Sequence, residues 1–160
     1  MKTVVAKDLD QKTHVIPLNQ VVWRPSAYGI IIKNGKILLC PNSRGGWELP
    51  GGGVEIDEDI TQAVEREVRE ETGLAAKFSR IVATRENFFY SDEGKTYHSI
   101  LFACLMKNAS GKISASGFDD WEKIYLRQAE WVNLDKIDEL KVTTTIDWRE
   151  AVKELIKEGK

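Results

Sequence analysis

The sequence reads GGVEIDEDITQAVEREVREETGL from residue 52 to residue 74. The apolar residues of this stretch recur with the period of an amphipathic helix, which we expect over residues 59–72. At about 100° per residue, Glu67, Glu70 and Glu71 fall on the same arc of that helix as its apolar side chains. A helix on a protein surface normally turns its charged residues outward. The pattern therefore predicts three carboxylates that face the protein interior.

Clustered carboxylates in a protein interior call for a positive partner. An isolated carboxylate is costly to remove from water, and neighbouring negative charges raise one another's pKa values. A divalent cation is the simplest compensation, and carboxylate oxygens suit hard ions such as Mg²⁺ or Mn²⁺. The alternative is a solvated acidic helix, which is the usual meaning of a run of charges. The inward placement of the acids argues against that alternative.

The same stretch resembles the signature of the Nudix (MutT-type) hydrolases, G-x5-E-x7-R-E-U-x-E-E-x-G-U, in which U is an aliphatic residue. The fixed positions are filled by Gly52, Glu58, Arg66, Glu67, Val68, Glu70, Glu71, Gly73 and Leu74. The preceding residues 47–55, WELPGGGVE, are also similar to that family. The resemblance implies an α/β fold, a Nudix-like α/β/α sandwich with a mixed β-sheet between helices.

The resemblance also implies roles for residues of the signature. Glu67, Glu70 and Glu71 correspond to the metal-binding carboxylates of the family, and the Gly52 carbonyl is a further expected ligand of Mg²⁺ or Mn²⁺. Glu67 either binds metal or acts as the base, and this choice stays open. Arg66 is expected to orient a glutamate through a charge-assisted hydrogen bond. The alternative for Arg66 is an ordinary i, i+4 pair with Glu70.

Further candidates lie on the substrate side of the signature. Gly51 and Gly53 flank the first signature glycine, so the backbone there can approach a ligand closely; the alternative is a tight turn without a ligand. Glu55 is a candidate supporting acid near the site. Arg44 precedes the glycine turn and is a candidate for binding a substrate phosphate, or else a plain surface arginine. Arg24 and Arg85 are weaker candidates for binding a substrate phosphate.

A further acid often comes from a loop outside the signature in related enzymes. Residues 108–120 are polar and rich in Gly and Ser, which predicts a mobile loop that can close over the site. The candidate acids in or beside it are Asp119, Asp120 and Glu122, with Glu130 as an alternative. Ordinary surface acids are the competing interpretation for each.

Several aromatic side chains are candidates for stacking on a base, although core packing is the commoner role of such residues. They are Trp23, Tyr28, Phe88, Phe89, Tyr90 and Trp121. Tyr90 is placed where the dinucleoside-polyphosphate hydrolases of the family tend to carry a tyrosine. The proline typical of ADP-ribose hydrolases at the comparable place is absent.

The remaining elements follow from turn signals and local periodicity. Strands are predicted over 27–33, 36–41, 47–49, 75–90, 96–107 and 124–133. Asn34-Gly35 predicts a hairpin between the first two of these strands. A helical turn is expected over 135–140 and a C-terminal helix over 143–158, where Asp147 and Glu150 have the spacing of a capping box. We predict a single domain over 1–160, in which 1–24 form an N-terminal extension.

Composition narrows the function classes. The chain has 160 residues, a formal net charge of −2 and a pI of about 5.8, so no basic track for nucleic acid is expected. The N-terminal residues are expected to form neither a signal peptide nor a membrane span. Cys40 and Cys104 lie in apolar runs and are expected to be buried free thiols, which favours the cytoplasm. Two histidines in the whole chain make a zinc site improbable.

These observations predict a hydrolase that cleaves a nucleoside diphosphate linked to another group. A nucleoside triphosphate or modified triphosphate is the favoured substrate, ahead of a dinucleoside polyphosphate or a nucleotide sugar. The alternative from another class is a nucleotide-binding module on the same fold without catalysis. The expected partner is a small-molecule nucleotide, with no nucleic acid and no membrane. A homodimer stays open, because relatives in the family are often dimers.

Overall fold

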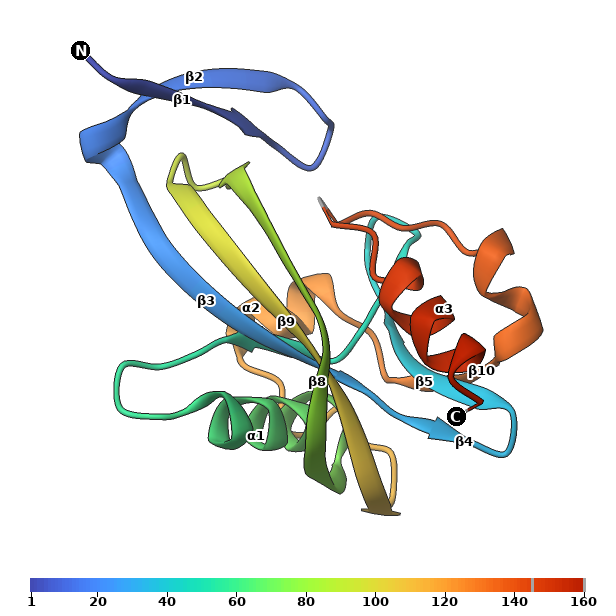
Figure 1. The fold of residues 1–160 in the computed structure, drawn as a ribbon. Coiled ribbons are helices and arrows are strands. Elements are labelled where there is room, and N and C mark those ends of the chain that lie inside the picture. The colour runs from blue at the N-terminus through green and yellow to red at the C-terminus, as the bar shows by residue number, and fades with distance from the viewer. Residues whose placement is uncertain (145, 160) are drawn as a thin grey trace.

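Two β-sheets and three α-helices form the part of the chain that the computed structural model describes, residues 1–144 and 146–159 (Figure 1). The larger sheet has the order β2-β1-β8-β9-β3-β7. These strands are, in the same order, Thr13–Pro17, Thr3–Lys7, Leu74–Tyr90, Thr96–Gly111, Val21–Ile30 and Gly51–Gly53. β3 runs parallel to β9 and β1 runs parallel to β8, whereas β8 pairs antiparallel with β9 and β7 pairs antiparallel with β3. The sheet is therefore mixed, as predicted.

The smaller sheet is built around the predicted hairpin. Its order is β10-β5-β4, and a further strand, β6, pairs with β5. The bounds are Glu130–Asn133 for β10, Lys36–Pro41 for β5, Ile32–Lys33 for β4 and Trp47–Glu48 for β6. Asn34 and Gly35 both have positive φ angles, 52° and 72°. This backbone geometry is what a two-residue type I′ turn requires, so the hairpin prediction is confirmed.

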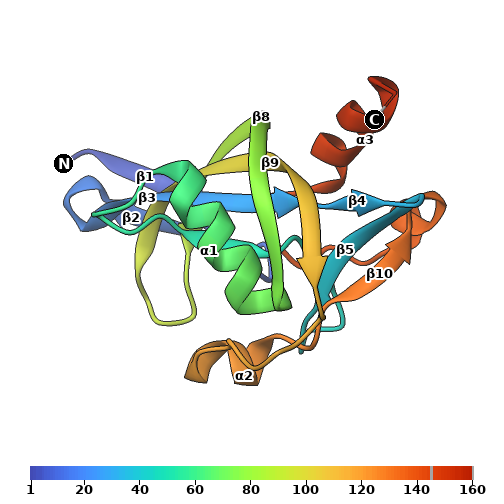
Figure 2. The same cartoon turned by 90° about the horizontal axis from the view of Figure 1, so that it is seen from below.

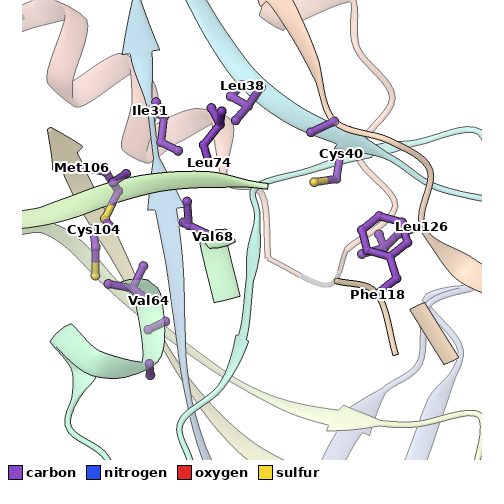
Figure 3. Packing of buried hydrophobic residues seen from close by; sticks show 14 residues of the cluster. Ile31, Leu38, Cys40, Val64, Val68, Leu74, Cys104, Met106, Phe118 and Leu126 are labelled. Carbon is purple, nitrogen blue, oxygen red and sulfur yellow. The ribbon is translucent and has the colours of Figure 1, made fainter. Parts of the chain in front are cut away.

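Helix α1, Ile60–Thr72, is capped at both ends. The Asp59 carboxylate accepts a hydrogen bond from the Gln62 N–H, and the Gln62 side chain accepts one from the Asp59 N–H in return. Gly73 ends the helix in the left-handed conformation at φ 76°. The helix packs on β3, β7 and β8, and Figure 3 shows its Val64 and Val68 side chains among buried residues of the sheet.

Helix α3, Arg149–Lys157, covers a second core, which is separate from the one beneath α1 (Figure 2). Alternate residues of β5 serve the two cores: Leu38 and Cys40 belong to the α1 cluster, whereas Ile37 and Leu39 belong to the α3 cluster. This alternation is the two-residue period of a strand with both faces covered. The α/β fold class with a mixed sheet between helices is therefore confirmed.

The predicted loop and strand between β9 and β10 are partly wrong. β9 continues to Gly111, and Asp120–Tyr125 forms a helix, α2, where the start of a strand was expected. Asp119 and Glu122 make a reciprocal capping box that begins this helix. The spacing of Asp119 and Glu122 in the sequence is that of a capping box, which favours the start of a helix. The pattern of the apolar residues that follow predicts a strand, but the first of them belong to this helix.

The C-terminal helix is shorter than the predicted range 143–158. It begins at Arg149, and Thr143 and Thr144 before it use their hydroxyl groups in hydrogen bonds with Asn42 and the Ile146 carbonyl. The Asp147 carboxylate accepts from the Arg149 N–H and guanidinium, so the expected capping box does not form. Residues 145 and 160 lie outside the described residues.

The N-terminal residues 1–24 contain the β1–β2 hairpin, a 3₁₀ turn at Leu18–Gln20 and the start of β3. β1 pairs with β8 through Lys7 and Phe89, and Figure 1 shows the hairpin at the far end of the larger sheet from β4. The predicted turn near residue 135 is a 3₁₀ helix, Leu134–Glu139. Within the described ranges, no helix is long and apolar enough to cross a membrane.

Candidate active site

Three carboxylates meet beside the C-terminal half of α1. Glu67, Glu71 and Glu122 each place one carboxylate oxygen so that these atoms all lie within 4.8 Å of one another. Glu67 and Glu71 are buried residues of α1, and Glu122 is a residue of α2. Glu70 does not join this group, because its side chain is 43% exposed at the edge of the helix. We call Glu67, Glu71 and Glu122 the acid cluster.

Packing around α2 brings Glu122 to α1. Helix α2 buries none of its own residues, but Phe118 before it and Leu126 after it belong to the core beneath α1 (Figure 3). Gly117 lies directly against α1, since an added Cβ there would be 2.5 Å from the Glu70 carbonyl oxygen. The chain on both sides of α2 is thus anchored to α1, and Glu122 is held where α1 presents its inward acids.

Burial dominates the electrostatics of the acid cluster. It raises the pKa of Glu71 well above the usual range, although the Gly51 N–H, 2.8 Å from Glu71 Oε2, lowers that pKa in part. Burial also raises the pKa of Glu67 against the opposing effect of Arg66, and it raises the pKa of Glu122. Repulsion by other members of the cluster adds to the shifts of Glu67 and Glu71. The cluster is therefore short of positive charge.

The donor set fits a divalent cation. Three carboxylates within reach of one another supply the oxygen ligands that Mg²⁺ and Mn²⁺ prefer. The Gly52 backbone lies against Glu67, because an added Cβ on that glycine would be 2.7 Å from Glu67 Oε1. Together with the Gly52 backbone, these residues are suited to hold the cation and would leave part of its coordination to water and substrate.

Arg66 connects the acids that surround the cluster. Its Nη1 donates to Glu67 Oε1 at 2.8 Å and to Glu70 Oε2 at 3.1 Å, so the orienting contact and the i, i+4 pair are both present. Its Nε and Nη2 donate to the two carboxylate oxygens of Glu58, and Nη2 also reaches the Gly53 carbonyl at 3.2 Å. The guanidinium lowers the pKa of Glu58. Arg66 thereby fixes α1 to the glycine-rich strand β7.

A second buried network lies next to the acid cluster and was not predicted. Glu48 Oε1 accepts a hydrogen bond from the Tyr125 hydroxyl and one from Asn42 Nδ2, the latter at 2.7 Å. Burial nevertheless raises the pKa of Glu48. Tyr125 follows Glu122 by three residues in α2, so this network links α2 to β6. Sequence spacing gives no sign of it, because its members are far apart along the chain.

The acid cluster faces a pocket of about 650 Å³. The predicted site residues that line it are Gly51, Gly52, Gly53, Glu55, Glu67, Glu71, Asp119 and Glu122. Of the candidate aromatic residues, Trp23 and Trp121 line the pocket and are largely exposed, 66% and 58%. An exposed aromatic face in a pocket is available for stacking on a planar ligand.

Other predicted site residues lie elsewhere in the structure. Arg44 pairs with Asp10 at 3.2 Å and with Asp92 at 3.0 Å, and it is not among the described lining residues of the pocket. Tyr90 stacks on His14 with ring centroids 4.0 Å apart. Two candidate loop acids point to solvent, since Asp120 is fully exposed in α2 and Glu130 is exposed in β10. None of these side chains reaches the acid cluster.

Residues 23–154 match the family model of the NUDIX domain. The chain belongs to the Nudix family. It is an enzyme of the Nudix hydrolases, as its sequence signature predicted.

Both cysteines are buried and free, which agrees with the expectation from their apolar surroundings.

Relatives and solved structures agree with the family assignment. The ADP-ribose pyrophosphatase of Methanocaldococcus jannaschii is 30% identical over 140 residues, which cover 85% of this chain and 75% of that protein. The CTP pyrophosphohydrolase of Escherichia coli is 44% identical over 62 residues, 36% of this chain and 46% of that protein. The crystal structure of a MutT Nudix hydrolase from Burkholderia pseudomallei is 25% identical with a TM-score of 0.65, and the match covers 84% of this chain and 98% of that one.

The length of the match differs among curated relatives. The chain spans less than half of three Nudix hydrolases of Arabidopsis thaliana, 38%, 23% and 44% of their lengths. These proteins contain sequence beyond the part that matches, so their similarity concerns the Nudix domain.

Proposed function

We propose that this protein is a divalent-metal-dependent hydrolase that cleaves a phosphoric anhydride in a nucleoside diphosphate linked to another group. The observation that carries the proposal is the acid cluster, whose three oxygens lie within 4.8 Å of one another and face the pocket. A divalent cation would balance these buried acids in their ionised form, and it would also compensate the charge of an anionic substrate. Mg²⁺ or Mn²⁺ is the proposed cofactor.

The residues of this chain have distinct parts in the proposed reaction. A bound Mg²⁺ or Mn²⁺ would neutralise the phosphate oxygens and lower the pKa of water. Glu71, Glu122 and the Gly52 carbonyl would hold the cation, and Arg66 donates a hydrogen bond to one oxygen of Glu67. Water attacks phosphorus, a glutamate of the site accepts its proton, and two phosphorylated products leave. Whether Glu67 is that base or a further ligand stays open.

A nucleoside triphosphate or modified triphosphate is the proposed substrate, ahead of a dinucleoside polyphosphate or a nucleotide sugar. The similarity to a CTP pyrophosphohydrolase supports a triphosphate. The similarity to an ADP-ribose pyrophosphatase supports a sugar-linked diphosphate, although the proline typical of ADP-ribose hydrolases is absent. A nucleotide-binding module without catalysis is the remaining alternative. The intact acid cluster argues against it, because binding alone does not require so many buried acids.

A nucleotide screen tests the proposed function. The purified protein is incubated with nucleoside triphosphates, dinucleoside polyphosphates, nucleotide sugars and ADP-ribose in Mg²⁺, Mn²⁺ or EDTA, and the products are identified by mass. We expect two phosphorylated products that require the metal. Glu139→Gln, which removes an exposed acid that is not among the described lining residues of the pocket, serves as the control for glutamate substitution. Binding of nucleotide without any product in either metal would overturn the proposal.

Millimolar Mg²⁺ or Mn²⁺ is expected to raise the melting temperature of the wild-type protein. A ligand that binds only the folded state adds RT ln(1 + [L]/Kd), about 2.7 kcal/mol when its concentration is one hundred times Kd. Glu71→Gln should lose most of this increase, and Glu139→Gln should keep it. Differential scanning fluorimetry measures the effect. Equal shifts in all three proteins would count against the acid cluster as the metal site.

Without metal, the free energy of unfolding is expected to fall as pH rises above the ordinary glutamate pKa of about 4.3. Burial raises the pKa values of Glu67, Glu71 and Glu122 in the folded state, so the folded chain keeps protons that the unfolded chain has released. This contribution is complete below the unfolded pKa and is lost as pH rises through the folded values. Urea titrations in EDTA across this range measure it. A stability that increases with pH throughout would contradict the assigned direction.

A further inference from the structure

We propose that Arg24 binds a phosphate group of the substrate that is not held at the acid cluster. This inference rests on the proposed function and deepens it, because it requires a substrate with at least two phosphate groups. It also assigns the phosphate contact to Arg24 and not to Arg44, the stronger candidate from sequence order.

The charge distribution of the pocket is the first argument. Its acidic lining residues are Glu48, Glu55, Glu67, Glu71, Asp92, Glu93, Asp119 and Glu122. Arg24 is the single basic residue among the described lining residues. A polyanionic nucleotide is repelled by such a lining, and focused fields in a cleft strengthen the effect. A cation at the acid cluster compensates the phosphate next to it, and Arg24 supplies the other positive charge.

The position of Arg24 is the second argument. Arg24 lies in β3, the strand that pairs with the glycine strand β7. An added Cβ on Gly53 would be 3.6 Å from Arg24 Nε and 3.9 Å from Nη2. Gly52, the preceding residue, lies against Glu67. Arg24 and Glu67 therefore lie against neighbouring residues of the same short strand, and both side chains line the same pocket.

The state of the Arg24 guanidinium is the third argument. It lies over the ring of Tyr97, 5.1 Å from the centroid, and no carboxylate of the described residues lies within ion-pair distance of it. Stacking on an aromatic face restricts a guanidinium without using its N–H donors. The planar fork thus remains free to bind phosphate oxygens in pairs.

The other two arginines considered from the sequence are already committed. Arg44 pairs with Asp10 and Asp92, and Arg85 pairs with Glu154 of α3 at 3.0 Å. Neither is a described lining residue of the pocket. For either one to bind a substrate phosphate, it would have to give up these partners and move.

The test compares Arg24→Gln with the wild type in Mg²⁺, by calorimetric titration with two probes that resist hydrolysis. These are α,β-methylene-ADP and methylenediphosphonate, which share the linked phosphates but not the nucleoside. We expect Kd to rise about tenfold for both probes, as for a lost hydrogen bond to a charged group. Arg24→Lys should recover part of the affinity, because it restores charge without the planar fork.

Control measurements separate phosphate binding from structural effects. Arg80→Gln removes a half-exposed arginine whose partner is Glu158 and should bind both probes like the wild type. The Mg²⁺-dependent rise in melting temperature should be the same in Arg24→Gln and the wild type, since the acid cluster is intact. A loss of that rise in Arg24→Gln would show a structural defect and would overturn the assignment.

Three further outcomes would overturn it. They are an unchanged Kd for both probes, a weakening limited to α,β-methylene-ADP, and a wild type that binds neither probe. The proposed function fails separately, in the nucleotide screen on the same wild-type preparation. A wild type that hydrolyses nucleotides, together with an Arg24→Gln variant of normal affinity, refutes the role of Arg24 alone.

Discussion

Glu71→Gln is expected to lower kcat/KM for the substrate identified in the nucleotide screen by about 10²–10³-fold, the range for loss of one group that contributes to electrostatic stabilisation of the transition state. Glu71 is buried, and its carboxylate belongs to the acid cluster. The amide has nearly the same shape but no charge, so the metal loses an anionic ligand while the core packing is retained. Steady-state kinetics at several Mg²⁺ concentrations measure the loss.

The same substitution is expected to stabilise the metal-free protein above neutral pH. An amide at this position removes a buried charge whose pKa burial has raised, and it can still accept the hydrogen bond from the Gly51 N–H. A variant that loses activity but gains stability shows that the acid serves function, because replacing an acid that stabilises the fold would lower stability. An inactive Glu71→Gln protein that is also unfolded in EDTA would contradict this interpretation, and Glu139→Gln controls for the type of change.

Arg66→Ala is expected to lower both stability and activity. Arg66 is the side chain that holds Glu58, Glu67 and Glu70 around the glycine strand. Its removal leaves the buried Glu67 without its main donor, which costs about 1–3 kcal/mol for an unsatisfied group. We expect kcat/KM to fall by about 10–100-fold, as for residues that orient metal ligands. Urea unfolding and kinetics on the same preparations measure both effects.

Two variants sharpen the test of Arg66. Arg66→Lys should recover much of the stability and little of the activity, because one ammonium group cannot serve Glu58 and Glu67 in a fixed plane. Arg69→Ala removes an exposed arginine from the same helix and should change neither quantity by more than a few tenths of a kcal/mol. Full activity in Arg66→Lys would show that charge alone suffices and that the planar contacts are dispensable.

The elements that depend on neighbouring residues agree with the sequence predictions. The period of α1 and the hairpin at Asn34-Gly35 both arise within a few residues. The errors occur where two local signals compete. Residues 119–122 carry a capping box between a segment of loop-like composition and the predicted strand 124–133, and the helix that this box begins is what forms.

The inward face of α1 shows the limit of a helical period. Glu67 and Glu71 are separated by about 40° around the helix axis, whereas Glu70 and Glu71 are separated by about 100°. All three acids fit a broad arc, but the surrounding sheet buries only Glu67 and Glu71. Glu70 remains 43% exposed, at the border between protein and solvent. How wide the buried arc is depends on the surfaces packed against the helix.

The sequence by itself determined the helix, its two buried acids Glu67 and Glu71, and the family, because these follow from residues within one continuous segment. The tertiary structure alone decided that Glu122 completes the acid cluster, that Glu48 contacts Tyr125, and that Arg24 faces the pocket while Arg44 does not. These contacts join segments far apart along the chain. Their geometry is set by how α2 and the loops pack on the sheet, and residue spacing carries no information about that packing.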